Sequence, residues 1–242
     1  MSCKINYLRS PLPCKLCTKK PKVRRRSTIF FSFSSSEKQL KTISTSTSIE
    51  TPTTEAYSVS FKTEKGCKLG ISRYPDFEYD AEGGGGTGIG AKVTQNPANN
   101  DLPVSFDLET LYIPPLTSST TKFLGLPLPP FLKIDIVPEA LQGSINQESG
   151  KVDLEFKAKF LFSAGSFYKA PPLLVKTVLT SEEIKGTMKS GRGKRLDKEG
   201  KCRLVGVATV DPIDDFLMNS FLGLPTECLA DLNAVISISS SS

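Results

Sequence analysis

The chain has 242 residues, with 31 Lys and Arg against 25 Asp and Glu and a formal net charge of +6. It contains no histidine, which excludes Ser-His-Asp and Cys-His catalysis, histidine-ligated metal sites and the commonest general base at neutral pH. The positive charge lies at one end. Residues 1–50 contain eleven basic and two acidic residues, whereas residues 51–242 contain 20 basic and 23 acidic residues. The body of the protein is therefore mildly acidic, and we expect no nucleic-acid partner.

The N-terminal segment has the composition of a targeting sequence. Fifteen of the 28 residues from Ser27 to Thr54 are Ser or Thr, and acidic residues are nearly absent. Organelle transit peptides are rich in Arg and Ser and poor in acidic residues, and the excess of Ser and Thr favours a chloroplast over a mitochondrion. We predict a plastid transit peptide and disordered linker over residues 1–55 and a single β-rich domain over residues 56–242. An ordinary disordered basic tail is the alternative.

The six cysteines do not indicate a metal site. Cys3, Cys14 and Cys17 lie in the predicted leader, and Cys67, Cys202 and Cys228 are far apart in the rest of the chain. Without histidine nearby, these three are expected to behave as small buried hydrophobic residues. We therefore predict no metal and no cofactor. No stretch approaches the roughly 20 apolar residues needed to cross a bilayer.

From Tyr57 onward, apolar and polar residues alternate with a period of two, which indicates half-buried β-strands. We predict strands at residues 57–61, 69–73, 77–79, 104–112, 132–136, 151–163, 173–179, 184–189, 202–210 and 232–238. The strand at 132–136 is expected to end at Pro138. No strand–helix–strand rhythm is present, so the fold class is mainly β, an antiparallel barrel or strongly bent sandwich of about nine or ten strands with two short helices.

Residues 83–90 contain a run of glycines that resembles a phosphate-binding loop. Such a loop requires a helix directly after it, and the residues that follow are those of a strand or loop and then a turn at Asn96 and Pro97. We predict instead a flexible hairpin tip, or a place where the backbone approaches another segment closely.

The pentapeptide Phe-Leu-Gly-Leu-Pro occurs twice, at residues 123–127 and 221–225. In each copy we predict a short helix that ends at the glycine and cannot continue past the proline. The matching flanks favour an internal duplication. The two segments close one end of the sheet or form the mouth of a ligand cavity, and the predicted ligand-binding residues are Phe123, Leu124, Leu126, Phe131, Phe221, Leu222 and Leu224.

Two charged segments have both a structural and a functional interpretation. Asp214 and Asp215 can form a catalytic carboxylate pair, but their place directly before residues 216–222 favours a helix cap. The basic residues between Lys185 and Lys201 can bind anionic headgroups, although a solvated hairpin is the simpler interpretation.

Three features together resemble a group of plant plastid-targeted β-rich proteins of unknown function. They are the Ser/Thr-rich leader, the segment Leu-Pro-Leu-Pro-Pro-Phe-Leu-Lys-Ile-Asp-Ile at residues 126–136, and the ending from Asp211 through the second pentapeptide. The resemblance covers most of the chain from about Val104 onward. It implies a plastid location and carries no catalytic motif.

Our leading functional hypothesis is a non-catalytic plastid protein that binds an apolar small molecule or lipid, or docks on a plastid membrane surface. It would lie in the stroma or peripheral to the thylakoid or envelope. The first alternative is a histidine-independent isomerase or cyclase for an apolar substrate. Its catalytic candidates are Glu109, Tyr112 and Asp135, because they are polar residues in otherwise apolar strands. The second is an assembly factor for a plastid complex.

The leader prediction has a direct test. We expect a fluorescent protein fused to residues 1–60 to enter chloroplasts, because this segment has a net charge of +9 over its first 50 residues and too little apolar surface to fold. Fluorescence microscopy of the fusion in leaf cells is the measurement. Diffuse cytosolic fluorescence would contradict the prediction and return Cys14 and Cys17 to the functional argument.

Overall fold

The computed structural model describes residues 54–93 and 100–240. In these ranges the chain forms fifteen strands and one helix, in the order β1 (Thr54–Thr63), β2 (Cys67–Ile71), β3 (Phe77–Tyr79), β4 (Gly85–Val93), β5 (Asp101–Phe106), β6 (Thr121–Phe123), β7 (Leu126–Pro127), β8 (Leu132–Asn146), β9 (Val152–Ala164), β10 (Tyr168–Lys169), β11 (Leu173–Thr180), β12 (Glu183–Lys185), β13 (Ser190–Arg192), β14 (Lys201–Val210), α1 (Phe216–Leu222) and β15 (Thr226–Ser240). The predicted leader, apart from Thr54 and Glu55, and the predicted turn at Asn96 lie outside the described residues.

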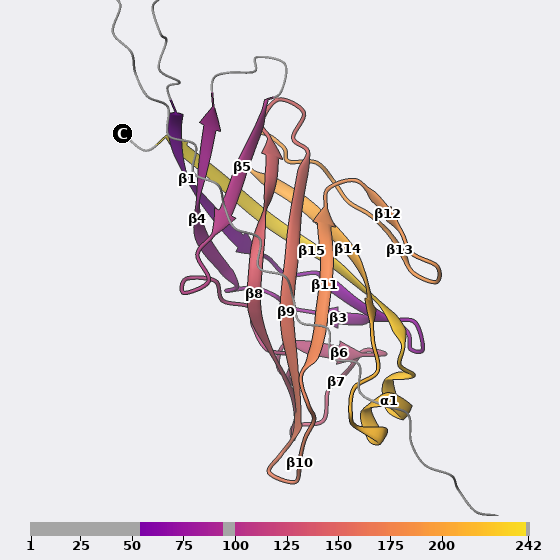
Figure 1. The fold of residues 1–242 in the computed structure, drawn as a ribbon. Helices are drawn as coiled ribbons and strands as arrows, with labels where there is room; N and C mark the ends of the chain where they lie inside the picture. Colours follow the sequence, from indigo (N-terminus) through magenta and orange to yellow (C-terminus); the bar gives the residue numbers. More distant parts are fainter. Residues whose placement is uncertain (1–53, 94–99, 241–242) are drawn as a thin grey trace, which may run out of the picture. The chain divides into compact units, whose positions relative to one another are not determined.

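Eight strands are hydrogen-bonded into a ring, in the order β1, β4, β5, β8, β9, β11, β14, β15 and back to β1 (Figure 1). Every neighbouring pair in this ring is antiparallel. The structure thus confirms the predicted mainly β, antiparallel fold.

The ring differs between its two ends because β15 has two neighbours on the same edge. The second half of β15 pairs with β1, and its first half pairs with β2, from which β3, β6 and β7 continue as a ribbon. The helix α1 directly precedes this first half of β15. We call the end of the ring that carries α1 and this ribbon the helix end.

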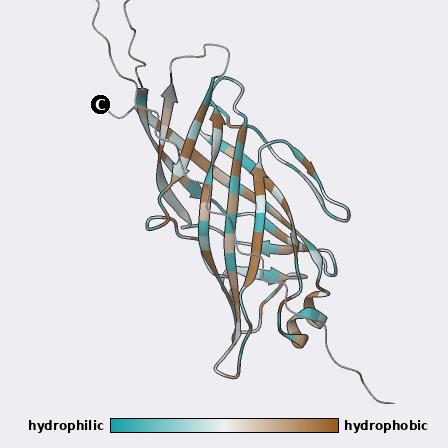
Figure 2. Cartoon of the chain, viewed as in Figure 1, coloured by the Kyte–Doolittle hydropathy of each residue, from teal (hydrophilic) through white to brown (hydrophobic). Residues whose placement is uncertain are grey.

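Along most of the strands, inward-facing apolar residues alternate with outward-facing polar residues, and Figure 2 shows this as bands of apolar and polar residues. On β9, Val152 and Leu154 are fully buried, whereas Asp153 and Glu155 between them are partly or fully exposed. Away from the helix end the interior is filled. Its packed core contains Val59, Phe61, Leu102, Val104, Phe106, Leu141, Ile145, Val152, Leu154, Leu179, Leu204 and Ile236.

The strand predicted to end at Pro138 instead continues to Asn146, so that part of the prediction is wrong. The pairing of β8 with β9 shifts register between Pro138 and Ala140, which is the position of a β-bulge. Glu139 at the bulge accepts ion pairs from Lys157 and Lys159 at 2.7 and 2.5 Å. These two lysines hold its pKa at about 2. The bulge admits the proline and moves the apolar side chains after it back onto the inner face.

Only the second pentapeptide forms the predicted helix. There, Asp215 caps α1 by accepting a hydrogen bond from the Met218 backbone N–H at 2.8 Å, and Gly223 ends it in the left-handed conformation. The cap interpretation of Asp215 is therefore confirmed. The helix predicted at the first copy is wrong, because Leu124 and Gly125 have positive φ values of 51° and 79° and form the turn between β6 and β7. The two copies have different backbone structures.

The glycine run is a strand and not a hairpin tip. β4 pairs along its whole length with β1, and its glycines allow the close approach that was the other half of the prediction. A Cβ atom added to Gly88 would lie 2.5 Å from the Ser105 carbonyl oxygen, and one added to Gly85 would lie 2.4 Å from that of Phe61. A larger residue at either position would push neighbouring backbone apart.

The single strand predicted at residues 184–189 is replaced by the hairpin of β12 and β13, which forms its own two-stranded sheet. Its turn is attached to β15 by Glu227. The backbone N–H groups of Thr187, Met188 and Lys189 donate to the Glu227 carboxylate at 2.7, 2.7 and 2.9 Å. These three hydrogen bonds favour the charged form and lower the pKa of Glu227 to about 2.

We predict that this attachment depends on the charge of Glu227. The folded-state pKa of about 2 lies below the usual 4.5, so the stabilisation is present above about pH 4.5 and is lost as the pH falls through 2. Glu227→Gln should increase hydrogen exchange at the amides of Thr187, Met188 and Lys189 at neutral pH. Glu183→Gln, which removes only the exposed ion pair with Lys185, is the matched control. Equal protection of these amides in Glu227→Gln and the wild type would contradict the prediction.

Candidate functional site

The helix end of the ring contains a cavity of about 380 Å³. Its wall is formed by the inner faces of β8, β9, β11, β14 and β15 together with β2, β3, β6 and α1. The lining residues are Leu69, Gly70, Ile71, Tyr74, Phe77, Leu116, Phe123, Leu128, Pro129, Leu132, Ile134, Phe156, Phe160, Phe162, Leu173, Val175, Thr177, Gly206, Ala208, Val210, Met218, Phe221, Leu222, Leu224, Thr226, Cys228, Leu229 and Ala230. Two larger hollows, of about 900 and 850 Å³, are open surface grooves whose walls include charged residues.

The cavity exists because small side chains occupy two neighbouring strands at the helix end. β14 places Gly206 and Ala208 on the inner face, and β15 places Cys228 and Ala230 there. Further along β14 the equivalent inner position is Leu204, which is fully buried in the packed core. The change from large to small residues leaves the interior unfilled at one end, although protein interiors are normally packed without such voids.

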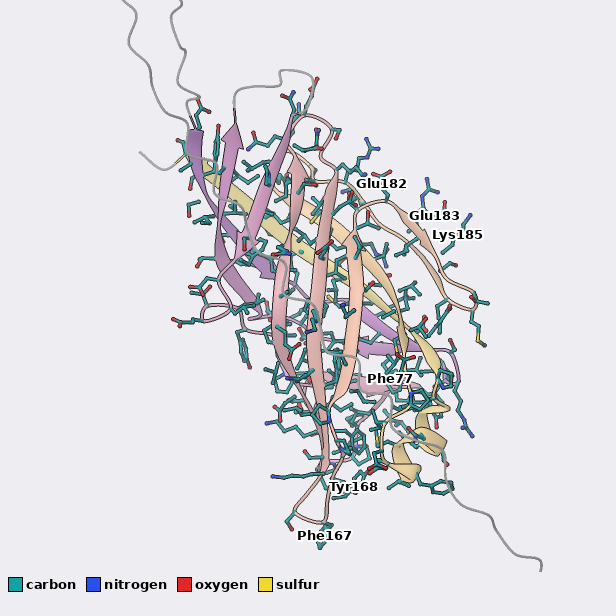
Figure 3. The ribbon with its side chains drawn as sticks, viewed as in Figure 1. Phe77, Phe167, Tyr168, Glu182, Glu183 and Lys185 are labelled. Carbon is teal, nitrogen blue, oxygen red and sulfur yellow. The ribbon has the colours of Figure 1, made fainter. Side chains whose placement is uncertain are left out.

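Aromatic rings surround this space and join the two pentapeptides. The ring of Tyr74 lies between those of Phe123 and Phe221, with centroid distances of 6.3 and 5.6 Å. Its hydroxyl donates to the Phe221 carbonyl oxygen at 2.6 Å. Phe77 of β3, labelled in Figure 3, packs on Phe123 with ring centroids 4.8 Å apart, and Phe162 contacts Phe221 at 6.3 Å. The two copies of the pentapeptide thus meet at the wall of one cavity.

The ring is weakest where β11 meets β14. These strands pair only at Thr180 and Val205, whereas each pairs along its full length with its other neighbour, β9 or β15. Beyond that point the hydroxyl of Thr177 donates to the Val207 carbonyl oxygen at 2.8 Å, so a side chain takes the place of a backbone donor. Lining residues of the cavity flank this seam on both sides.

The lining carries no Asp, Glu, Lys or Arg. Its titratable groups are the Tyr74 phenol and the Cys228 thiol. Burial raises the pKa of Cys228 to about 11, so the thiol is neutral at physiological pH. The hydroxyls of Tyr74 and Thr177 already donate to backbone carbonyls. The chemistry of the site is therefore that of a neutral, largely apolar container.

The structure brings four of the predicted ligand-binding residues to this cavity, namely Phe123, Phe221, Leu222 and Leu224. The other three, Leu124, Leu126 and Phe131, are exposed and do not line it.

The three catalytic candidates lie elsewhere. Glu109 and Tyr112 are exposed in the segment after β5. Asp135 lies between the inward-facing Ile134 and Ile136, so its carboxylate faces outward, where it pairs with Lys133 at 2.7 Å. The structure does not bring these three residues together or into the cavity.

Sequence reasoning missed the contribution of β2 and β3 and of the small residues on β14 and β15. The sequence predicts only half-buried strands at Leu69, Ile71 and Phe77. The signal that could have found the site is the fall in side-chain size along residues 204–208, where Leu204 gives way to Gly206 and Ala208 on the same face.

Comparison with protein-family models, curated proteins and solved structures finds no match to this chain. Among the described residues, there is no cluster of three or more Cys, Asp or Glu side chains that could hold a metal ion. In the same part of the chain, no helix combines the length and apolar character needed to traverse a bilayer.

The cavity predicts an unusual response to added bulk. Ala208→Leu should leave the free energy of unfolding unchanged or raise it by up to about 2 kcal/mol, because three extra carbons enter unfilled apolar space. Ala234→Leu, in the filled core, should cost about 1 to 3 kcal/mol by overpacking. Urea unfolding of both variants measures the difference, and equal destabilisation of the two would show that the space at Ala208 is not available.

Proposed function

We propose that this protein is a non-catalytic plastid protein that binds a neutral apolar small molecule or lipid chain in the cavity at the helix end. The observation that carries the proposal is an uncharged, aromatic-walled space inside an otherwise packed ring. A charged ligand would lose its hydration there and find no counter-charge. An apolar ligand would gain by leaving water and would contact aromatic walls on several sides.

The size of the cavity limits the ligand. Its volume of about 380 Å³ lies near the lower end of the range of roughly 300–1,000 Å³ that holds drug-sized ligands. A single acyl chain or a small cyclic isoprenoid fits this range. A lipid with two chains would have to leave part of itself outside.

The isomerase or cyclase alternative has lost the observation that motivated it. It required Glu109, Tyr112 or Asp135 to point into a dry cavity, and all three lie outside the lining. No feature of the described residues favours the assembly-factor alternative over ligand binding.

Titration with a neutral fluorescent dye that brightens in apolar surroundings, N-phenylnaphthylamine, tests the proposal. We expect saturable binding to the wild type and an affinity at least about tenfold lower in Ala208→Leu, because the leucine occupies the dye's space. Thr209→Leu, one residue along β14 with its side chain exposed, is the matched control and should bind as the wild type does. Unsaturable binding, or equal affinity in Ala208→Leu, would contradict the proposal.

A further inference from the structure

Large apolar side chains project into solvent from four segments around the helix end. Phe167, at the β9–β10 turn, is 95% exposed and lies at the tip of this hairpin in Figure 3. Phe216, the first residue of α1, is 87% exposed. Leu124, Leu126, Phe131 and Leu217 are also exposed. We call these six side chains the apolar rim.

Contacts between the segments show that the rim is one feature. The backbone N–H of Gly165 donates to the Phe131 carbonyl oxygen at 2.7 Å, which ties the β9–β10 turn to the start of β8. Phe162 lies against both Tyr168 of β10 and Phe221 of α1, with ring centroids 6.1 and 6.3 Å away. Tyr74 in turn joins Phe221 to Phe123, next to Leu124. The rim therefore surrounds the same end of the ring as the cavity.

Basic residues accompany the apolar tips at a fixed spacing. Lys122 lies two residues before Leu124, Lys133 two residues after Phe131, and Lys169 two residues after Phe167, and all three lysines are exposed. Neither Lys122 nor Lys169 forms an ion pair with any residue of the described ranges 54–93 and 100–240, whereas Lys133 pairs with Asp135. Lysines behind apolar tips match the phosphate level above a lipid interface, since their stems lie along apolar surface while the ammonium stays in water.

We propose that the apolar rim docks on a phospholipid bilayer, with Phe167 and Phe216 inserted at the interface. The side chains of Phe167 and Phe216 make few contacts with their own protein. A protein partner would therefore need a separate pocket for each of them. A fluid lipid interface accommodates any arrangement of tips. The docking does not depend on the cavity, but it extends the proposed function, because an apolar ligand could pass between bilayer and cavity without crossing bulk water.

The charges around the rim indicate what drives the docking. The basic groups are the three lysines and Arg73, whose guanidinium donates to the Ser220 carbonyl oxygen of α1. The acidic groups are Asp135, which pairs with Lys133, Glu78 opposite Lys122, and Asp211, Asp214 and Asp215 just before α1. The rim thus has no excess of positive charge, and burial of apolar side chains supplies the affinity. Binding should therefore depend little on ionic strength.

The test is flotation of the full chain with vesicles of phosphatidylcholine. This lipid has no net charge, so the basic residues 1–50, with their net charge of +9, do not obscure the result as they would with anionic vesicles. We expect the wild type to float with the vesicles at ionic strengths of both about 0.1 M and about 1 M. The double variant Phe167→Ser with Phe216→Ser should partition at least about tenfold less.

The matched control is Ile89→Ser with Val178→Ser, which removes two exposed apolar side chains from the outer faces of β4 and β11, beside the packed core, and should float as the wild type does. Phe167 and Phe216 do not line the cavity, so the rim variant should still bind the neutral dye. If the wild type does not bind the dye, the cavity proposal fails and the docking proposal is unaffected.

The docking proposal is overturned if the wild type does not float or the rim variant floats equally well. It is also overturned if analytical ultracentrifugation shows that the rim variant converts a wild-type dimer into monomers, because the rim would then be a self-association surface.

Discussion

Successive residues of a β-strand point to opposite faces, so closing eight strands into a ring commits every second residue of each strand to the interior. The sizes of these inward-facing side chains then determine which part of the interior is filled. Leu154, Leu204 and Ile236 fill one end. At the helix end, Gly206 and Ala208 leave space in front of the aromatic residues of β9. The cavity is thus a property of side-chain size along strands and needs no sequence motif.

The bulge in β8 is the second requirement of this arrangement. Ile134 and Ile136 face inward before it at even positions, whereas Leu141 and Ile145 face inward after it at odd positions. A continuous strand would have placed one set in solvent. The register shift between Pro138 and Ala140 removes this conflict. A single irregularity therefore keeps both the core and the cavity wall apolar.

Strands with uninterrupted alternation could be predicted from the sequence. The strand expected at residues 151–163 is observed as Val152–Ala164, within one residue at each end. The pentapeptide at residues 123–127 could not be predicted in the same way, because its left-handed glycine serves equally in a helix cap and in a hairpin turn. The second copy follows the capping residue Asp215, whereas the first extends a strand that pairs with β3. The five residues of each copy do not specify the distant segment with which that copy pairs.

The candidate site could be predicted only in part, for a related reason. Phe123 and Phe221 stand out as apolar residues next to turns, and both reach the cavity. Ala208, Cys228 and Ala230 have no local signal, because their importance depends on which distant side chains they face. Leu124 and Phe131 are apolar in the same way as Phe123, yet they point outward. Sequence alone could not separate the lining of the cavity from its rim.

We propose that the cavity holds an apolar molecule in the cell. The decisive measurement is native mass spectrometry of the protein purified from the cells that produce it, with release of any bound molecule by organic extraction and comparison with Ala208→Leu purified in parallel. We expect one neutral, single-chain or small cyclic apolar ligand at a stoichiometry near one in the wild type and its loss in the variant. Wild-type protein that carries no ligand, or a ligand retained equally by Ala208→Leu, would contradict it.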